Sequence, residues 1–253
     1  MFAPEDLTQD GFLGGHLIVA QPRNGYRAAM DPVLLAAACP AYAGQSVLEL
    51  GCGAGVASLC LGWRVPGLRL AGLEVQPSYA VLARDNAARN GIMLEVFEGD
   101  LAAPPPDLRA QNFDHVIANP PYFAPCDGTS AADAGRELAR RELTPLDQWV
   151  RQALRRLHPG GQITLIQQAD RLADVLCALA GRAGSTQVLP IAPRQGRAAG
   201  RVIVQARKGG RGVLRLLAPL VLHAAPAHIR DGEDMTPEVR KILRNGAPLV
   251  LDH

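Results

Sequence analysis

The chain has 253 residues, of which 26 are basic and 24 acidic, so its formal net charge is only +2, and 48% are hydrophobic. This length and apolar content suit one α/β domain with a single large core. The five cysteines form no CxxC pair and the six histidines show no metal-ligand spacing, which argues against a disulfide framework and a metal site. The N-terminus lacks a basic region followed by an apolar run, and no apolar stretch reaches about 18 residues. We therefore expect a cytoplasmic protein with no membrane partner.

Strand-like and helix-like segments alternate along the chain, in the pattern of a mostly parallel sheet with helices on both faces. Strands are expected at residues 46–50, 68–73, 94–97, 113–118 and 162–167. Helices are expected at 56–61, 77–90, 145–157 and 171–181, the last with Asp170 as its N-cap. Two further strands, at 186–191 and 201–206, predict a closing antiparallel hairpin, and Thr236 and Gly246 are expected to bound a short last helix.

The motif Asn119-Pro120-Pro121-Tyr122 directly follows the expected strand at 113–118. An exocyclic amine on a base or an amide is a poor nucleophile because its lone pair is delocalised. Hydrogen-bond acceptors must therefore bind its N–H groups to make the lone pair available. The side-chain carbonyl of Asn119 and the backbone carbonyl of Pro120 supply two acceptors, and the Tyr122 ring can stack on a planar group. The two prolines stiffen the turn, and a purely structural corner is the alternative.

A glycine-rich turn lies between the first expected strand and the first expected helix. Its sequence, Glu49-Leu50-Gly51-Cys52-Gly53-Ala54-Gly55, permits a tight turn and lets a ligand approach the backbone. Glu74 ends the second strand, where it can accept from ribose hydroxyls, and Asp100 ends the third. The glycines alone would also fit a structural turn or a nicotinamide site. The two acidic residues and the Asn-Pro-Pro-Tyr turn favour S-adenosylmethionine.

Together, these motifs resemble those of class I S-adenosylmethionine-dependent methyltransferases that methylate amino groups. Within that superfamily, the segment from Gln21 to Asp31 is similar to the segment that precedes the glycine turn in bacterial tRNA (adenine-N6) methyltransferases. Those enzymes methylate the adenine beside the anticodon of a valine tRNA. The similarity includes residues 136–140 and 201–204 and covers about residues 15–208.

The resemblance implies a Rossmann-like class I methyltransferase fold, with a mostly parallel seven-stranded sheet that ends in an antiparallel hairpin. We expect one methyltransferase domain over residues 1–253. Within it, residues 1–45 would cover the cofactor, 46–208 would form the catalytic core, and 209–253 would be a C-terminal extension. Residues 123–137 are rich in small and polar residues and are expected to form a lid near the acceptor.

The resemblance also assigns the cofactor to a set of residues, with Glu74 on the ribose and Asp100 facing the adenine. The full set is Arg27, Asp31, Glu49, Gly51, Gly53, Gly55, Glu74, Asp100 and Asn119. Arg27 and Asp31 would close over the methionine end, and pairing of these two with each other is the alternative. Glu49 stands where aspartate is commoner, a change that keeps the acceptor. Asn119 to Tyr122 would hold the target base.

The basic residues are unevenly distributed along the chain. Residues 175–230 contain nine cations and no acid, which leaves 17 basic and 24 acidic residues elsewhere. This asymmetry predicts a positive face that meets several phosphates of RNA. The residues expected to contact RNA are Arg136, Arg140, Arg194, Arg197 and Arg201. The alternative is an ordinary solvated surface, with strand positions such as Arg201 paired internally.

Three functions remain open, because Asn-Pro-Pro-Tyr does not distinguish an adenine amine from a guanine amine or a glutamine amide. The first is an RNA methyltransferase, acting on adenine N6 in tRNA or, as a variant, on guanine N2 in rRNA. The second is a protein glutamine-N5 methyltransferase, which is expected to carry a larger N-terminal substrate domain, whereas only 45 residues precede Ser46. The third is a cofactor-binding protein without catalysis, which would more readily have lost Asn119 or Tyr122.

Overall fold

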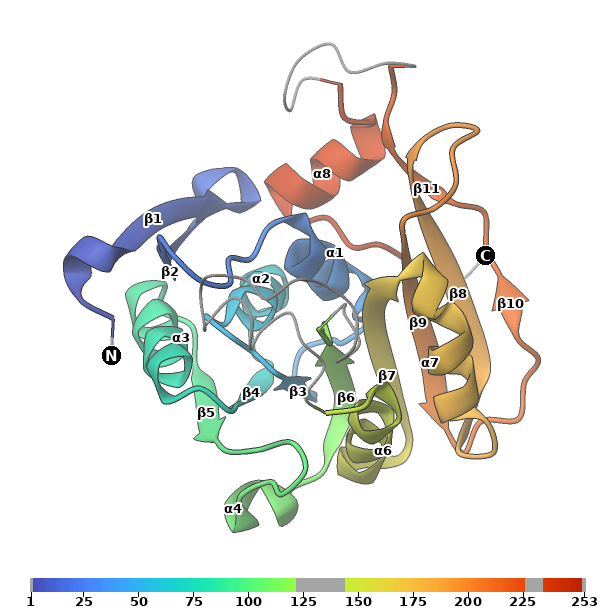
Figure 1. Ribbon diagram of the computed structural model, residues 1–253, viewed down its shortest axis with the longest axis horizontal. Helices are drawn as coiled ribbons and strands as arrows, with labels where there is room; N and C mark the ends of the chain where they lie inside the picture. The colour runs from blue at the N-terminus through green and yellow to red at the C-terminus, as the bar shows by residue number, and fades with distance from the viewer. Residues whose placement is uncertain (1, 122–143, 226–233, 252–253) are drawn as a thin grey trace.

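The computed structural model describes residues 2–121, 144–225 and 234–251, arranged around one large sheet (Figure 1). In this part of the chain nine strands form the sheet, in the order β10-β8-β9-β7-β6-β3-β4-β5, with β11 also paired to β8. Seven of them confirm the expected strands: β3 (Ser46–Leu50), β4 (Arg69–Glu74), β5 (Leu94–Glu98), β6 (Phe113–Ala118), β7 (Leu157–Gln168), β8 (Ala183–Arg194) and β9 (Arg201–Lys208). Two short strands that were not expected, β10 (Arg215–Leu216) and β11 (Leu220–His223), extend the sheet along β8.

Five neighbouring strands, β5, β4, β3, β6 and β7, run parallel. By contrast, β9 runs antiparallel to both β7 and β8, which confirms the expected hairpin and inserts β9 between two earlier strands. Because the carboxyl ends of parallel strands meet at one edge of a sheet, the residues that follow β3, β4, β5 and β6 come together at that edge. The glycine turn, Glu74, Asp100 and the Asn-Pro-Pro-Tyr motif occupy these positions.

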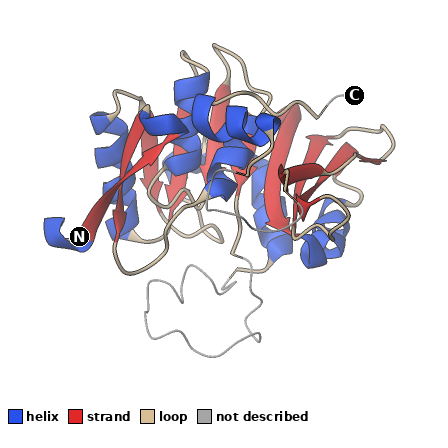
Figure 2. Cartoon of the chain, turned by 90° about the horizontal axis from the view of Figure 1, so that it is seen from above, coloured by secondary structure: helices blue, strands red, loops and turns tan. Residues whose placement is uncertain are grey.

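Helices cover both faces of the sheet (Figure 2). One face carries α1 (Met30–Ala38), α2 (Val56–Arg64) and α3 (Pro77–Arg89), and the other carries α4 (Pro106–Arg109), α6 (Leu146–Arg156) and α7 (Leu172–Leu179). Successive strand residues point to opposite faces, so Val47 packs with the first set of helices and Leu48 with the second. Each face therefore buries its own apolar core. No helix in the described ranges is long and apolar enough to cross a membrane.

An antiparallel ribbon that was not predicted precedes α1. Its strands are β1 (Leu7–Phe12) and β2 (Leu17–Pro22). The buried side chain of Asn86, on α3, bonds to the backbone N–H and carbonyl of Ala20 at 2.8 and 3.0 Å, and donates to the carbonyl of Ala54 at 3.0 Å. One side chain thus ties the ribbon to α3 and to the glycine turn.

The last helix, α8 (Pro237–Asn245), begins and ends as expected. The hydroxyl of Thr236 accepts from the backbone N–H of Val239 at 3.4 Å, and Gly246 follows the helix with φ of 62°. Glycine adopts this left-handed conformation without a Cβ clash, so it is a common residue just after a helix. The helix packs on α1 and on the turn at Leu13–Gly15, which joins the C-terminal segment to the N-terminal one.

The expected N-cap of α7 is wrong. Asp170 lies inside a 3-10 turn, Ala169–Arg171, and α7 starts after Arg171 with no side-chain cap bond. The 3-10 turn runs directly into the helix, and the carbonyl of Ala169 accepts from the N–H of Leu172. A backbone acceptor therefore satisfies the first helical donor in place of a side chain.

Candidate functional site

A cavity of about 740 Å³ lies at the carboxyl edge of the parallel strands. Of the predicted site residues, those that line it are Arg27, Asp31, Glu49, Gly51, Gly53, Glu74, Asp100, Asn119, Pro120, Pro121 and Arg201. Gly55, Arg194 and Arg197 are not part of its wall. Tyr122, Arg136, Arg140 and the expected lid at 123–137 lie outside the described residues. Residues far apart in the sequence thus meet around one space.

The glycine turn is closely packed from two sides. Gly51 and Gly55 have φ of 66° and 85°, a conformation that favours glycine. A Cβ on Gly51 would lie 2.6 Å from Cη2 of Trp149 on α6. A Cβ on Gly55 would lie 3.4 Å from the side chains of Ala83 and Leu94. Gly51 therefore keeps the cavity wall close to α6, while Gly55 lets α2 begin against α3 and β5.

Glu74, the last residue of β4, fixes the glycine turn from the neighbouring strand. Its carboxylate accepts from the backbone N–H of Gly53 at 2.8 Å and of Gln76 at 2.9 Å. Burial raises the pKa of this carboxyl, and the bonds from Gln76 and Gly53 oppose the rise. A carboxylate has about four acceptor sites, so Glu74 can still accept from a further donor, such as a ribose hydroxyl in the cavity.

Glu49 is buried in β3 and holds the first turns of α2. Its Oε2 accepts from both the backbone N–H and the hydroxyl of Ser58, at 2.9 and 2.6 Å. Burial raises the pKa of Glu49 to about 7 and the negative charge of Glu74 adds to the rise, while the two Ser58 bonds oppose it. The side chain also forms part of the cavity wall, so one carboxyl links the cavity to the orientation of α2.

Asp100 stands two residues after β5, at the exposed rim of the cavity. Its carboxylate accepts from the backbone N–H of Ala102 at 2.8 Å, which closes a local turn. Between these two residues, Leu101 is buried and also lines the cavity. An acceptor next to an apolar surface is a combination that suits the edge and face of an adenine ring.

The turn that follows β6, which begins with Asn119, Pro120 and Pro121, is held by hydrogen bonds on two sides. Nδ2 of Asn119 donates to the phenol oxygen of Tyr26 at 3.4 Å. Oδ1 of Asn119 is buried and has no hydrogen-bond partner among the described residues. On the other side, Nε2 of the buried Gln167, on β7, donates to the carbonyl of Pro121 at 3.4 Å. The turn therefore presents a buried acceptor whose bond is not made by the described part of the chain.

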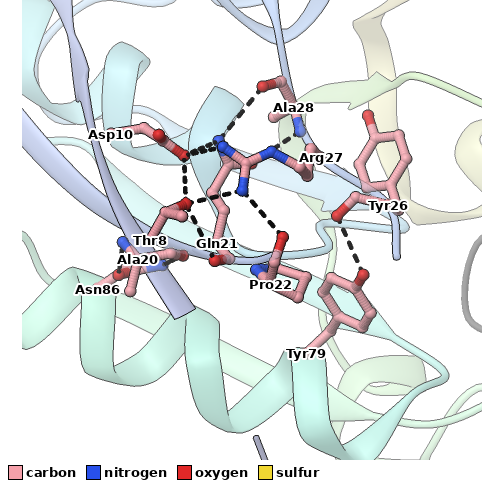
Figure 3. A network of polar contacts seen from close by, with 10 residues as sticks. All are labelled: Thr8, Asp10, Ala20, Gln21, Pro22, Tyr26, Arg27, Ala28, Tyr79 and Asn86. Atoms are coloured by element: carbon pink, nitrogen blue, oxygen red, sulfur yellow. Dashed lines mark hydrogen bonds and ion pairs between the residues drawn. The ribbon is translucent and has the colours of Figure 1, made fainter. Parts of the chain in front are cut away.

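Arg27 and Asp31 do not pair with each other, so that alternative is wrong. The guanidinium of Arg27 donates to Asp10 and Thr8 of β1, each at 2.7 Å, and to the carbonyl of Pro22 at 2.9 Å (Figure 3). Arg27 is thus bound to the ribbon. This contact could not be predicted, because the ribbon itself was not predicted. Asp31 accepts from Nε of Arg201 at 2.7 Å.

Three residues of this site were not assigned a role from the sequence: Tyr26, Trp149 and Gln167. Tyr26 lies in the segment from Gln21 to Asp31, and its ring lies over the glycine turn, 3.7 Å from where a Cβ of Gly53 would be. Trp149 lines the cavity, and its indole N–H is buried without a partner in the described ranges. Tyr26 could have been chosen from the sequence, because it lies in the segment from Gln21 to Asp31 that resembles the methyltransferases. Trp149 and Gln167 belong to no motif, and only their packing in the structure places them at the site.

The basic residues of the stretch 175–230 that the structure describes are divided between two ends of the sheet. Because β9 is antiparallel to β7, Arg201 is paired with Gln168 at the cavity edge, and Arg207 with Gln162 at the far end. Arg194 and Arg197 share the cavity edge with Arg201, while Arg182, Lys208 and Arg211 lie near Arg207. Arg194 also pairs at 2.9 Å with Asp234, whose side chain is 6% exposed. Of the three arginines at the cavity edge, Arg197 is the exposed one.

Comparison with known proteins identifies the family. A family model described as "methyltransferase small domain" matches residues 27–189. The chain belongs to the methyltransferase small domain family. A solved structure, titled as a predicted O-methyltransferase from Agrobacterium tumefaciens, has a TM-score of 0.71 and 28% identity, covering 88% of this chain and 100% of that one. The Rossmann-like methyltransferase fold expected from the sequence is therefore confirmed.

Two curated relatives of this chain carry the same name, tRNA1(Val) (adenine(37)-N6)-methyltransferase. The protein from Porphyromonas gingivalis is 34% identical over 158 residues, which are 59% of this chain and 61% of that protein. The protein from Dickeya chrysanthemi is 28% identical over 217 residues, which are 84% of this chain and 85% of that protein. The chain thus spans about three fifths of the first relative's length and most of the second's.

Proposed function

We propose that this methyltransferase-family chain transfers a methyl group from S-adenosylmethionine to the exocyclic N6 amine of an adenine beside the anticodon of a tRNA. The observation that carries the proposal is Oδ1 of Asn119, a buried acceptor without a partner among the described residues, at the edge of the cavity. A buried unsatisfied acceptor costs about 1–3 kcal/mol. A substrate amine that donates to it removes this cost when it binds.

The cavity fits S-adenosylmethionine by size and by the kinds of groups on its wall. About 740 Å³ is within the range of small-molecule sites. We assign Glu74 to the ribose hydroxyls, Asp100 and Leu101 to the adenine, and the backbone of Gly51 and Gly53 to the methionine and ribose. When bound, the cofactor supplies the electrophilic methyl group. The residues of the cavity wall would hold that methyl group in position.

The chain's own part in the reaction is to orient the acceptor amine. The side-chain carbonyl of Asn119 and the backbone carbonyl of Pro120 accept its two hydrogens, which turns the nitrogen lone pair toward the methyl group. Gln167 holds the carbonyl of Pro121 and so limits movement of this turn. We assign stacking on the base to Tyr122. No dedicated base is needed, because the amine loses its proton after attack.

Adenine in tRNA is the acceptor class favoured here, and two observations support it. Both relatives described above are named for adenine-N6 methylation of a tRNA. In addition, the exposed Arg197 stands in the turn between β8 and β9, at the edge where the cavity lies. A cation at that position can contact a phosphate beside the flipped base.

The test is transfer of labelled methyl from S-adenosylmethionine to bulk tRNA, rRNA and protein from a strain that lacks the gene, followed by nucleoside mass analysis. We expect label as N6-methyladenosine in tRNA. The matched variant is Asn119→Ala, which should keep cofactor affinity in calorimetry and lose methyl transfer. Label in rRNA guanine or in protein glutamine alone would overturn the adenine assignment, and normal turnover by Asn119→Ala would overturn the acceptor site.

A further inference from the structure

We propose that Tyr26 is a positioning residue for methyl transfer: its phenol oxygen holds the side-chain amide of Asn119 in the orientation that leaves Oδ1 free for the substrate amine. The inference rests on the proposed function and deepens it. It gives a role to the segment from Gln21 to Asp31, whose two named candidates, Arg27 and Asp31, both bond to other parts of the chain.

The argument begins with the shape of an asparagine amide. Its oxygen and nitrogen are nearly equal in size, so rotation by half a turn exchanges an acceptor for a donor at almost no steric cost. In one orientation Asn119 accepts from the substrate amine, and in the other its own N–H groups face those of the amine. Neighbouring polar groups must therefore select the orientation. Among the described residues, the phenol of Tyr26 is the side chain that bonds to this amide, at 3.4 Å from Nδ2.

The charges around Tyr26 favour its oxygen as the acceptor in this bond. Burial raises the pKa of the Tyr26 phenol, and the carboxylates of Asp31 and Glu49 raise it further, so the group stays protonated at any physiological pH. The same two negative charges attract the phenol's hydrogen. A lone pair of the oxygen is then left for a donor, and the donor that lies within reach is Nδ2 of Asn119.

Tyr26 can select an orientation only if its own position is fixed, and two sets of contacts fix it (Figure 3). The hydroxyl of Tyr79, on α3, donates to the backbone carbonyl of Tyr26 at 3.0 Å. On the C-terminal side, Arg27 is bound to the ribbon, and the backbone N–H of Ala28 donates to the side chain of Gln21 at 2.7 Å. The phenol is therefore carried by a short segment that is tied to α3 at Tyr26 itself and to the β1–β2 ribbon at Arg27 and Ala28.

A positioning role predicts a particular kinetic defect. Removing the hydroxyl with Tyr26→Phe leaves the ring over the glycine turn, so cofactor affinity should stay within about twofold of the wild type. The amide of Asn119 is then free to rotate, and the fraction of productive complexes falls. We expect the single-turnover rate of methyl transfer to fall about tenfold, with the KM for tRNA changed less than about threefold.

The matched control is Tyr79→Phe on α3, which removes a buried hydroxyl that holds the backbone of Tyr26 but does not bond to Asn119. Because the bonds of Arg27 and Ala28 still hold the segment, the single-turnover rate should change less than about threefold. An equal loss in both variants would show that loosening of the segment is the cause, and would overturn the proposal. So would a Tyr26→Phe enzyme with wild-type rate, or one whose loss lies wholly in cofactor affinity.

The same experiment separates this inference from the proposed function. The wild-type reaction reports the function itself, because the absence of N6-methyladenosine from tRNA would overturn the adenine assignment. The ratio of the Tyr26→Phe rate to the wild-type rate is measured on whichever amine the wild type methylates, so it reports the role of Tyr26 independently. Thermal unfolding of each variant, expected within about 3 °C of the wild type for a lost hydroxyl, checks that both remain folded.

Discussion

Arg201 on β9 and Asp31 in the first turn of α1 form an ion pair at 2.7 Å, although 170 positions separate them in the sequence. Both residues line the cavity. The last strand of the core is thereby joined to the first helix at the rim of the site. Arg201, an arginine expected to contact RNA, is thus also part of the fold, which changes what its removal should do.

Arg201→Ala should destabilise the fold. Asp31 is mostly buried, with 11% of its side chain exposed, while Arg201 is 39% exposed, so solvent screens the pair in part. We expect the free energy of unfolding to fall by about 1–2 kcal/mol, because a largely buried carboxylate loses its cation. Urea denaturation measures this, and Arg197→Ala, at an exposed turn position, should cost less than about 0.5 kcal/mol. Equal losses would contradict a specific role for the pair.

Arg197→Ala should weaken tRNA binding without affecting stability. Loss of one phosphate contact lowers affinity and reduces the slope of log affinity against log salt by about 1. The control is Arg207→Ala, since Arg207 is exposed at the opposite end of the same strand pair. Its affinity and salt slope should match the wild type in a filter-binding titration. If the two variants lost affinity equally, binding would not be confined to the cavity edge.

Gly51→Ala should damage both stability and cofactor binding. The new Cβ would approach Cη2 of Trp149 to 2.6 Å, and it would also impose a strained positive φ of 66°. Gly44→Ala isolates the strain, because Gly44 has φ of 89° but nothing within 4 Å of a Cβ. We expect Gly44→Ala to cost about 1–2 kcal/mol of unfolding free energy, and Gly51→Ala to cost more and to weaken S-adenosylmethionine binding at least about tenfold in calorimetry. Similar results for the two variants would mean that Trp149 moves aside freely.

The stability of the ligand-free protein should depend on pH through Glu49. Its pKa is raised from 4.5 to about 7, so the folded state binds this proton more tightly than the unfolded chain does. The resulting stability is complete below about pH 4.5 and is lost as the pH rises through about 7. Urea denaturation between pH 5 and pH 8 should show this decline, and Glu49→Gln, which cannot titrate, should show a smaller one. An identical pH profile for both proteins would assign the decline to other groups.

The sequence predicted the parts of the site that depend on local order. Gly51, Glu74 and Asn119 each follow or end a parallel strand, and parallel strands place their carboxyl ends at one edge, so their meeting could be foreseen. The ion pair between Arg201 and Asp31 could not be predicted, because it depends on the insertion of β9 beside β7. The reversal of direction at the hairpin also divides the arginines between two ends of the sheet, which a count along the sequence cannot reveal.

The ribbon β1–β2 was missed for a related reason. Its β1 strand has no fully buried residue, so it lacks the apolar alternation by which a strand is recognised. The other strand, β2, packs Leu17, Val19 and Ala20 into the core, and side-chain bonds from Arg27 and Asn86 add to this packing. Such bonds depend on partners from distant elements, as does the contact between Tyr26 and Asn119.

The insertion of β9 has a consequence for how the chain can be made or shortened. Residues 27–189, the span shared with the family, end inside β8 and omit β9 altogether. A fragment trimmed to that span would leave the facing edges of β7 and β8 with open backbone donors and acceptors, a template for aggregation. During synthesis the same two strands must wait until Lys208 has left the ribosome before the gap between them can be filled. The nascent chain is therefore most prone to aggregation late, after the glycine turn and the Asn-Pro-Pro-Tyr motif have already emerged.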